Sequence, residues 1–413
     1  MDASFFKGNR EKFSNLIEDG SVAVFMSGNP LRRSGDQFFP FEVDRNFYYL
    51  TGLDEQNLVL VIAKKDGVAE ESLYLPPLNE RMERSNGPAL RPSEASGISG
   101  VQEVIYTSYE QQIIDYLASG SGRAFQRLYC DYLTYPNLEN PQLLALINNL
   151  RNSCPYATVK YAGSLVHGLR YLKQPAEIEA IRSAIALTAE GLRNALANLA
   201  HGRPEYQIKA DFEDPIIRRN HGFGFATIVA AGLNSTVLHH SPGTYQGSTG
   251  DLVLFDVGAH SSYYSADISR TYPVSGKFSD KQRLVYEIVL NSQKECLAMM
   301  KPGATLASVS ETARLCAIRD LKSSGIISSD AEVTKHYYHG VCHPLGLNTH
   351  DVMPGGGEIL LAEGVVCTLE PGLYFPQWGF GVRIEDDVLI TRDGNEVLSP
   401  QIIKEIADIE NSF

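Results

Sequence analysis

The sequence lacks the features that would place it in a membrane or outside the cell. It contains no run of about 18 apolar residues, which a membrane-spanning helix would need. Its first residues show no apolar stretch behind a basic start, so we expect no secretory signal. The 6 cysteines form no C-x-x-C pair, which is typical of reduced, buried thiols. We therefore expect a cytoplasmic protein that has no membrane partner.

The sequence also has fewer basic residues than acidic ones. The chain carries 36 basic and 49 acidic residues, and its net charge of -13 argues against nucleic acid as a partner. Hydrophobic content is 43% and charged content 21%, as in ordinary globular proteins. With 413 residues the chain is long enough for two or three domains.

Histidine is absent from the first part of the chain, since all 10 histidines lie at or after His167. This asymmetry predicts a non-catalytic N-terminal domain over residues 1–168 and a catalytic domain over residues 169–413. The first domain is predicted to be α/β, with strands and helices in alternation. Its strands are predicted at 21–28, 46–52, 57–65 and 71–77, and its helices near 9–18, 108–119 and 140–151.

Helical periodicity dominates the start of the second domain. Apolar residues recur at three- and four-residue steps after Pro175, which predicts an amphipathic helix. Further helices are predicted from Pro204, from Ser279 with Gln282 as its capping-box partner, and over 305–324. Strand pairs are predicted over 224–239, 251–274, 337–348, 364–376 and 380–391. The second domain is therefore predicted to be α+β, with helices packed on a curved antiparallel sheet.

Two pairs of acidic residues mark predicted strands. Asp256 lies in the apolar strand DLVLFDVG, and Asp267 follows in YYSADISRTYP on the strand that should return beside it. Glu370 follows an apolar run in VVCTLEPG, and Glu385 lies in GVRIEDDVLIT on another returning strand. A buried carboxylate is costly unless it is paired or bound to a metal. One such residue alone could be a structural aspartate at a strand end.

Between the two acidic pairs lies the segment YYHGVCHPLGLNTHD, residues 337–351, with His339, His343, His350 and Asp351. Imidazole and carboxylate are the ligands that borderline and hard divalent metals prefer. One imidazole and four carboxylates would hold two such ions side by side. The pattern indicates a dinuclear metal hydrolase.

These motifs resemble, in their order, the pita-bread metallopeptidase family, which includes methionine aminopeptidases, prolidases and Xaa-Pro aminopeptidases. The likeness includes FDVGA, ADISRTYPVSG, HGVCHPLGLNTHD, LEPGLY and VRIEDD. The segment RRSGDQFFPFEVDRNFYYLTG resembles the domain that precedes the catalytic one in Xaa-Pro aminopeptidases and prolidases. The resemblance implies an α/β N-terminal domain of the aminopeptidase P type, followed by an α+β pita-bread (creatinase/aminopeptidase-like) catalytic domain. Pro344, directly after His343, departs from the family pattern and should alter the pocket slightly.

The resemblance also implies the metal ligands. Asp256 would bind one ion, His343 and Glu370 would bind the other, and Asp267 and Glu385 would bridge both. The ions would be divalent, with Mn²⁺ preferred and Co²⁺, Zn²⁺ or Fe²⁺ as alternatives. They would share a hydroxide that attacks the scissile bond, while Glu370 shuttles a proton to the leaving amine.

The remaining roles concern the substrate. The resemblance implies that His350 contacts the substrate and stabilises the tetrahedral intermediate. It places His239, in preference to His240, on the substrate side of the site, and His339 in the pocket. Arg383 stands two residues before Glu385, on the same strand face, and would orient a ligating carboxylate. The alternative for Arg383 is an ordinary solvated arginine.

The implied activity is release of the N-terminal residue ahead of proline from peptides. A prolidase restricted to Xaa-Pro dipeptides is the first alternative, because both enzymes share the ligands and the fold. A non-catalytic pita-bread binding module is the second alternative, although such modules typically lose ligands. The family also implies a homo-oligomer, either a dimer or a tetramer.

Overall fold

The computed structural model describes residues 1–106, 113, 125–131, 141–355 and 358–412. Contacts divide the chain into two compact units, unit 1 (Met1–Arg170) and unit 2 (Tyr171–Phe413). The helix predicted near 108–119 lies, apart from Ile113, outside the described residues. Within the described part, no helix combines the length and the apolar character that crossing a membrane requires.

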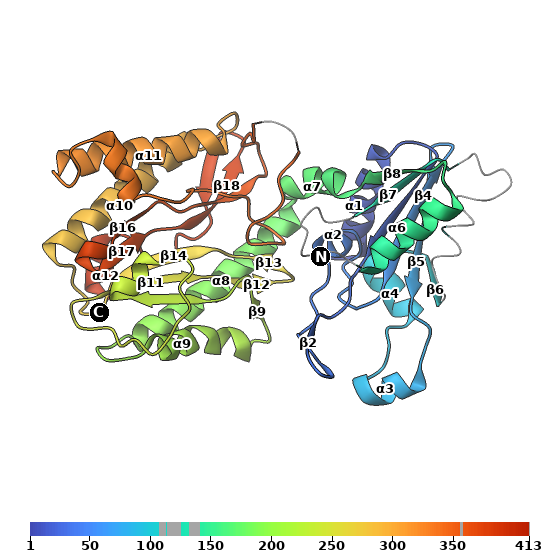
Figure 1. Ribbon diagram of the computed structural model, residues 1–413, viewed down its shortest axis with the longest axis horizontal. Helices are drawn as coiled ribbons and strands as arrows, with labels where there is room; N and C mark the ends of the chain where they lie inside the picture. Colours follow the sequence, from blue (N-terminus) through green and yellow to red (C-terminus); the bar gives the residue numbers. More distant parts are fainter. Residues whose placement is uncertain (107–112, 114–124, 132–140, 356–357, 413) are drawn as a thin grey trace. The chain divides into compact units, whose positions relative to one another are not determined.

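Among the described residues, unit 1 is built on a mixed six-stranded sheet in the order β6-β5-β4-β1-β7-β8 (Figure 1). The central strand β1 pairs antiparallel with β4 and parallel with β7, and all its residues are buried. This burial explains why the strand is a continuous apolar run rather than an alternating one. The strands of this sheet are β1 (Ser21–Met26), β4 (Val59–Lys65), β5 (Val68–Leu75), β6 (Glu103–Tyr106), β7 (Arg127–Cys130) and β8 (Thr158–Tyr161).

One predicted strand of unit 1, at residues 46–52, is wrong, because these residues form helix α2 (Arg45–Thr51). The Asp44 side chain accepts hydrogen bonds from the N–H groups of Asn46 and Phe47, and Gly52 ends the helix at φ 70°. Strong caps outweigh the strand preference of the aromatic residues. The other elements of unit 1 are α1 (Ala3–Leu16), β2 (Arg32–Ser34), β3 (Gln37–Phe38), α3 (Glu80–Asn86), α4 (Pro92–Ser99), α6 (Pro141–Ser153) and α7 (Gly163–Tyr171).

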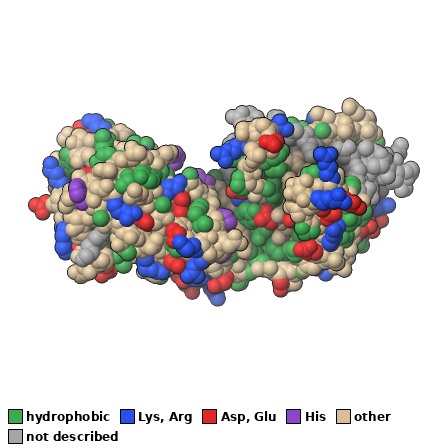
Figure 2. All heavy atoms as spheres, turned by 90° about the horizontal axis from the view of Figure 1, so that it is seen from below, with side chains coloured by type: hydrophobic (Ala, Val, Ile, Leu, Met, Phe, Trp, Pro, Cys, Tyr) green, Lys and Arg blue, Asp and Glu red, His purple; other side chains and the backbone are tan. Residues whose placement is uncertain are grey.

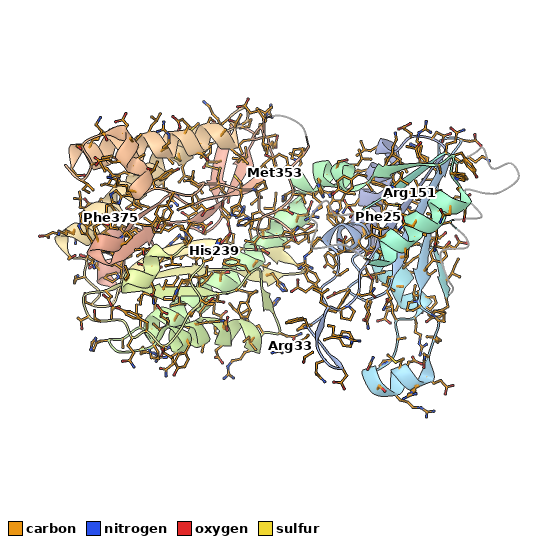
Figure 3. The ribbon with its side chains drawn as sticks, in the orientation of Figure 1. Phe25, Arg33, Arg151, His239, Met353 and Phe375 are labelled. Atoms are coloured by element: carbon orange, nitrogen blue, oxygen red, sulfur yellow. The ribbon has the colours of Figure 1, made fainter. Side chains whose placement is uncertain are left out.

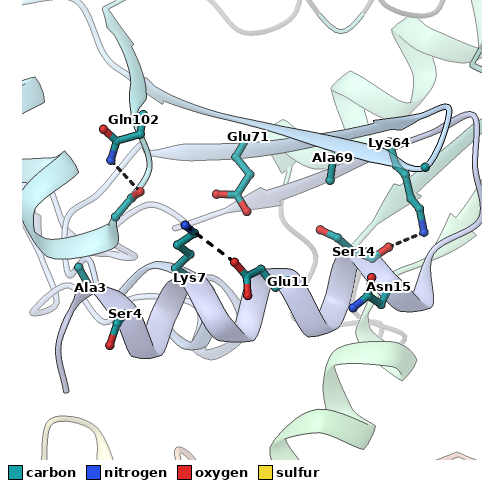
Figure 4. A pocket seen from close by; sticks show the side chains of 12 residues that line it. Ala3, Ser4, Lys7, Glu11, Ser14, Asn15, Lys64, Ala69, Glu71 and Gln102 are labelled. Atoms are coloured by element: carbon teal, nitrogen blue, oxygen red, sulfur yellow. Dashed lines mark hydrogen bonds and ion pairs between the residues drawn. The ribbon is translucent and has the colours of Figure 1, made fainter.

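Helix α1 and the β4–β5 hairpin border a cavity of about 770 Å³ (Figure 4). Lys64 Nζ donates to the carbonyls of Ser14 and Ile17 at 2.8 and 2.9 Å, which satisfies acceptors at the end of α1. None of the candidate metal or substrate residues lines this cavity. On the face shown in Figure 2, acidic and basic side chains intermingle over the described surface.

In unit 2 the strands lie between two helix pairs, α8 with α9 and α10 with α11 (Figure 1). The predicted capping box is confirmed: Ser279 Oγ accepts from Gln282 N, and Gln282 Oε1 accepts from Ser279 N. The predicted helix from Pro175 is also confirmed. The helices of unit 2 are α8 (Pro175–Ala197), α9 (Glu205–Arg218), α10 (Asp280–Met299), α11 (Leu306–Ser323) and α12 (Ile406–Asn411), with 3-10 turns η1 (Gly232–Thr236), η2 (Asp330–Lys335) and η3 (Pro376–Trp378).

The strands of unit 2 form four small antiparallel sheets: β10-β11-β14, β13-β12-β9, β15-β18-β19 and β16-β17. Their bounds are β9 (Gly222–Phe223), β10 (Ile228–Ala231), β11 (Leu252–Val257), β12 (Ala259–Ser261), β13 (Tyr264–Ser265), β14 (Ile268–Pro273), β15 (Val366–Leu369), β16 (Gly372–Phe375), β17 (Phe380–Arg383), β18 (Asp386–Thr391) and β19 (Gly394–Val397).

The predicted strand pair at 337–348 is wrong, because these residues contain only an isolated bridge, from Pro344 to Cys367. The segment runs beside β15 through separate hydrogen bonds, including Thr368 N to His343 O at 2.9 Å. Pro344 has no N–H to donate, which helps to interrupt a regular ladder. The predicted pair at 224–239 is also largely wrong, since strand β10 gives way directly to η1.

Candidate metal centre

The first acidic pair meets on strands β11 and β14. Asp256 in β11 lies opposite Ser269 in β14, and Asp267 directly precedes β14. Side chains alternate along a strand, so Asp267 and Ser269 point to the same face, toward Asp256. The chain between the two aspartates makes an excursion through β12 and β13 rather than a simple hairpin.

The second acidic pair comes from the other half of unit 2. Glu370 directly follows β15 and Glu385 directly precedes β18, with the β16–β17 hairpin between them. Ser269 joins the two halves: its carbonyl accepts from Glu385 N at 3.0 Å, and its hydroxyl donates to Glu385 Oε2 at 2.8 Å. These bonds hold the second acidic pair against the first.

All five predicted ligands lie in one cluster, together with His350. Their donor atoms fall into three overlapping groups, and within each group the atoms lie within 4.8 Å of one another. The groups are Asp256, Asp267 and Glu385; His343, Glu370 and Glu385; and Asp267, His343 and His350. Divalent cations are bound in proteins by such sets of oxygen and imidazole donors.

His343 is oriented as a metal-binding histidine should be. Its Nδ1 lies 3.0 Å from the carbonyl of Pro344, and its Nε2 lies 3.4 Å from Asp267 Oδ2 and 3.5 Å from Glu370 Oε1. When the proton resides on Nδ1, it is donated to the Pro344 carbonyl and the Nε2 lone pair faces the carboxylates. Pro344, which departs from the family pattern, therefore still supplies the backbone carbonyl that orients the His343 ring.

The carboxylates of the cluster have too few positively charged side chains beside them to neutralise their charge. Burial raises the pKa of Asp267 well above its ordinary value, and the nearby Glu385 and Asp256 raise it further. Burial, followed by Glu370 and Asp256, does the same to the pKa of Glu385. The pKa of Glu370 is raised to about 7, mainly by burial. Divalent cations would supply the missing charge and let these groups ionise, so the cluster fits bound metal ions.

Arg383 is only 4% exposed, so its alternative interpretation as a solvated arginine is wrong. Its guanidinium donates to Asp256 Oδ2 at 2.6 Å, to Ser269 Oγ at 2.7 Å and to Tyr374 OH at 3.0 Å. The planar, permanently charged group thus fixes one carboxylate of the cluster and a phenol beside it.

The three histidines that the sequence predicts on the substrate side lie around the same cluster. His339 Nε2 accepts from Tyr374 OH at 2.9 Å, and burial, then Arg383, lowers its pKa to about 4. The rings of His350 and His343 lie 4.1 Å apart, and burial, then His343 and His239, lowers the pKa of His350.

His239 is exposed and follows η1, where Figure 3 labels it. Its effect on the pKa of His350 places it within electrostatic range of the cluster. His240 points elsewhere, since its Nε2 lies 2.8 Å from the buried carboxylate of Glu205. The preference for His239 over His240 agrees with this placement.

The sequence analysis did not identify two residues that contribute to the site, namely Ser269 and Tyr374. Both are hydrogen-bonded to Arg383. Ser269 follows Asp267 by two residues, so strand alternation could have placed it on the same face. Tyr374 lies in the LEPGLY motif, but its contact with His339 depends on how distant segments fold together.

Comparisons with known proteins agree with this geometry. The model of metallopeptidase family M24 matches residues 179–392, and the model of the aminopeptidase P N-terminal domain matches residues 6–125. The chain is 31% identical to the Xaa-Pro aminopeptidase of Haemophilus influenzae, over 98% of this chain and 96% of that protein.

Solved structures extend the likeness to the whole fold. A Bacillus anthracis structure assigned to aminopeptidase P superposes with a TM-score of 0.95 at 38% identity and covers 100% of this chain and 98% of that one. Escherichia coli aminopeptidase P, solved with the inhibitor Pro-Leu, gives a TM-score of 0.90 at 29% identity with the same coverage. The predicted fold, an aminopeptidase P-type N-terminal domain followed by a pita-bread catalytic domain, is thus confirmed. The chain belongs to metallopeptidase family M24 and is a metal-dependent exopeptidase of that family.

Proposed function

We propose that this protein is an Xaa-Pro aminopeptidase with a dinuclear metal centre, which releases the N-terminal residue of peptides whose second residue is proline. The observation that carries the proposal is the convergence of one imidazole and four carboxylates in one cluster. The relative from Haemophilus influenzae is named an Xaa-Pro aminopeptidase, and the Escherichia coli relative was solved with a proline-containing inhibitor. Unit 2 would carry the catalysis, and unit 1 would be non-catalytic.

We assign the metal ligands as the sequence predicts. Asp256 would bind one ion, His343 and Glu370 the other, and Asp267 and Glu385 would bridge them. Four carboxylates to one imidazole favour a harder cation, so Mn²⁺ is our first choice, before Co²⁺, Fe²⁺ or Zn²⁺. Cys342 neighbours His343 but is absent from the metal-competent groups found among the described residues.

When bound, two divalent ions lower the pKa of a water molecule and so supply a nucleophile near neutral pH. The residues of this chain do the rest. Glu370 is placed to carry a proton, because its carboxylate lies within the cluster, with Oε1 3.5 Å from His343 Nε2. It would pass the proton from the nucleophile to the leaving proline nitrogen.

The neutral histidines would bind and orient the peptide. The lowered pKa of His339 and of His350 keeps both imidazoles uncharged. The His350 ring can then donate one hydrogen bond and accept another, whereas the ring nitrogens of His339 already face Gly340 and Tyr374. His350 would donate to the carbonyl oxygen of the scissile bond, where negative charge develops. His239 and His339 would flank the substrate, and Arg383 would hold Asp256 in place.

A prolidase remains the alternative, since both enzymes need the same ligands. The two differ in whether the site accepts chain beyond the proline. A non-catalytic binding module is disfavoured because all five ligand positions keep ligating side chains. We further propose a homo-oligomer, and a cytoplasmic location that suits six free cysteines.

The test compares Ala-Pro-Ala with the dipeptide Ala-Pro, using metal-stripped protein with and without added Mn²⁺. Ala-Ala-Ala serves as the control for proline specificity. Mn²⁺-dependent release of alanine from Ala-Pro-Ala supports the aminopeptidase. Cleavage of Ala-Pro alone would replace it with prolidase. A folded, Mn²⁺-loaded protein that turns over neither peptide would overturn the proposal.

A further inference from the structure

One residue of the histidine-rich segment has no place in the proposed chemistry, namely Asp351. Among the described residues it belongs to no metal-competent group, although it adjoins His350. Its Oδ2 lies 3.0 Å from Nζ of Lys173 instead, and both side chains are 1% exposed. A buried ion pair directly behind a substrate-binding histidine calls for an explanation, because such pairs contribute little net stability.

The pair is packed tightly against the loop of residues 343–351. A Cβ on Gly346 would lie 2.2 Å from Asp351 Oδ2 and 2.9 Å from Lys173 Cε, so only glycine permits this approach. Asp351 N donates to the carbonyl of Pro344 at 2.9 Å and closes the loop on itself. Ser265 N donates to the carbonyl of Gly346 at 2.8 Å and ties the loop to β13.

Lys173 is itself fixed in place before it meets Asp351. Its backbone N–H donates to the carbonyl of Gly364 at 2.8 Å, and helix α8 begins two residues later. The cation is therefore held at one point of unit 2 and draws the carboxylate of Asp351 to that point. This is how a buried ion pair can specify geometry.

His343 and His350 differ in how they are held. The backbone of His343 bonds to Thr368 in both directions, at 2.9 Å and 3.2 Å, and its Nδ1 contacts the Pro344 carbonyl. For the His350 ring, no hydrogen bond is present among the residues that the structure describes; its ring contact is with His343. The neighbour of His350 in the chain, Asp351, is by contrast fixed by its ion pair with Lys173.

We propose that Lys173 and Asp351 are positioning residues, whose buried ion pair sets the place of the His350 imidazole beside the metal centre. The inference rests on the proposed peptidase function. Partners of this kind, one step removed from the reacting groups, typically contribute 10- to 100-fold when they are replaced. The pair would act on substrate turnover through His350 and leave the metal ligands in place.

The experiment separates positioning from stability. Lys173→Met and Asp351→Leu each remove one partner of the buried ion pair, so each should lower Tm. The double variant Lys173→Met/Asp351→Leu buries two apolar side chains and should recover Tm. We expect its kcat/KM to stay about 10-fold or more below wild type. Recovery of kcat/KM together with Tm would overturn the proposal and make the pair merely structural.

Two further measurements use the same double variant. The Mn²⁺ concentration that gives half of the maximal rise in Tm should match that of the wild type, because His343 is anchored separately. In a His350→Ala background the double substitution should cause no further loss of kcat/KM, as expected for residues that act through one group. A changed Mn²⁺ midpoint, or an additive loss of activity, would overturn the assignment to His350.

If the double variant does not fold, Gly346→Ala displaces the Asp351 carboxylate without removing a charge. Its matched control is Gly250→Ala, where a Cβ would meet nothing within 4 Å. Histidine side-chain NMR of the Mn²⁺-free protein reads the position directly: the His350 signals should move while those of His343 stay. This outcome does not depend on turnover, so an inactive wild type would overturn the proposed function and leave the positioning test intact.

Discussion

Glu385 and Asp386 are adjacent in the sequence and both deeply buried, yet their electrostatic states are opposite. Burial would raise the pKa of Asp386, but Arg270 and Lys404 outweigh it and lower the pKa to about 2. Burial and the neighbouring Glu370 and Asp256 instead raise the pKa of Glu385 well above its ordinary value. Cations of the protein neutralise the charge of Asp386, whereas the neighbours of Glu385 are mainly other carboxylates.

Strand geometry produces this difference. Successive side chains leave a strand on opposite faces, so Asp386 meets Arg270 at 2.6 Å, Ser399 at 2.6 Å and Gln293 at 3.1 Å. Glu385, on the other face, meets the carboxylates of the metal centre. A structural carboxylate carries its counter-charge within the fold, whereas a ligating one is completed by a cation from solution.

The largest expected effect concerns the carboxylates of the candidate metal centre. Glu370→Gln removes the proton carrier while keeping the size of the side chain. We expect kcat for Ala-Pro-Ala to fall about 10²- to 10⁴-fold, the usual worth of a general acid–base group. Steady-state kinetics at saturating Mn²⁺ measures the change, with circular dichroism to confirm folding. A kcat near that of the wild type would remove Glu370 from the proton-transfer role.

The next largest effect concerns the contribution of Asp386, the carboxylate paired with Arg270 and Lys404, to stability. Asp386→Asn leaves the buried Arg270 and the partly buried Lys404 without their counter-charge, and we expect a loss of about 3–5 kcal/mol in the free energy of unfolding. Urea denaturation measures it. The control is Glu396→Gln in the exposed pair with Arg182, which should change stability by less than about 1 kcal/mol. Equal effects of the two substitutions would contradict the distinction between matched and exposed charges.

Adding metal ions to the metal-free protein should reveal which carboxylates bind a cation. Mn²⁺ at about 100 times its Kd should stabilise the metal-free protein by about 2.7 kcal/mol per site. Glu385→Gln should largely abolish this gain, and it should not destabilise the metal-free protein, because glutamine resembles the protonated carboxyl that the raised pKa of Glu385 favours. Thermal unfolding with and without Mn²⁺ tests both points. An undiminished Mn²⁺ effect in this variant would exclude Glu385 as a ligand.

The smallest effect is a pH dependence of the metal-free protein. Glu370, with its folded pKa of about 7, and Asp267 and Glu385, also raised, bind protons more tightly when folded. Their stabilisation is therefore full below their unfolded pKa values near 4 and is lost as pH rises toward 7.

The neutral His339 and His350 oppose this trend, because burial lowers the pKa of His350 and lowers that of His339 to about 4. The carboxylates outnumber them, so we expect stability to fall from pH 5 to pH 7 by about 1.4 kcal/mol per pH unit for each net proton. Urea titrations across this range measure the slope. The slope should flatten once Mn²⁺ is present, and a metal-free protein that gains stability toward pH 7 would contradict the account.

Local signals in the sequence were sufficient for many elements. The helix from Pro175 and the capping box at Ser279 depend on neighbouring residues, and both are present as predicted. The helix at Arg45–Thr51 was mistaken for a strand because its aromatic residues favour strands, while Asp44 and Gly52 supply the caps. Residues 337–348 were mistaken for strands because their apolar character did not reveal the interruption at Pro344.

The sequence by itself determined that carboxylates beside apolar strands would need a counter-charge once buried, and the resemblance to the family named the candidate ligands among them. Only the tertiary structure decided that Ser269 joins the two acidic pairs, that Arg383 holds Asp256, and that Asp351 turns to Lys173. These contacts link residues far apart along the chain, and no local pattern encodes which partner a buried polar group will meet. That choice is made when the sheets of unit 2 pack together: Asp386 then lies beside Arg270, whereas Asp267 and Glu385 lie beside other carboxylates.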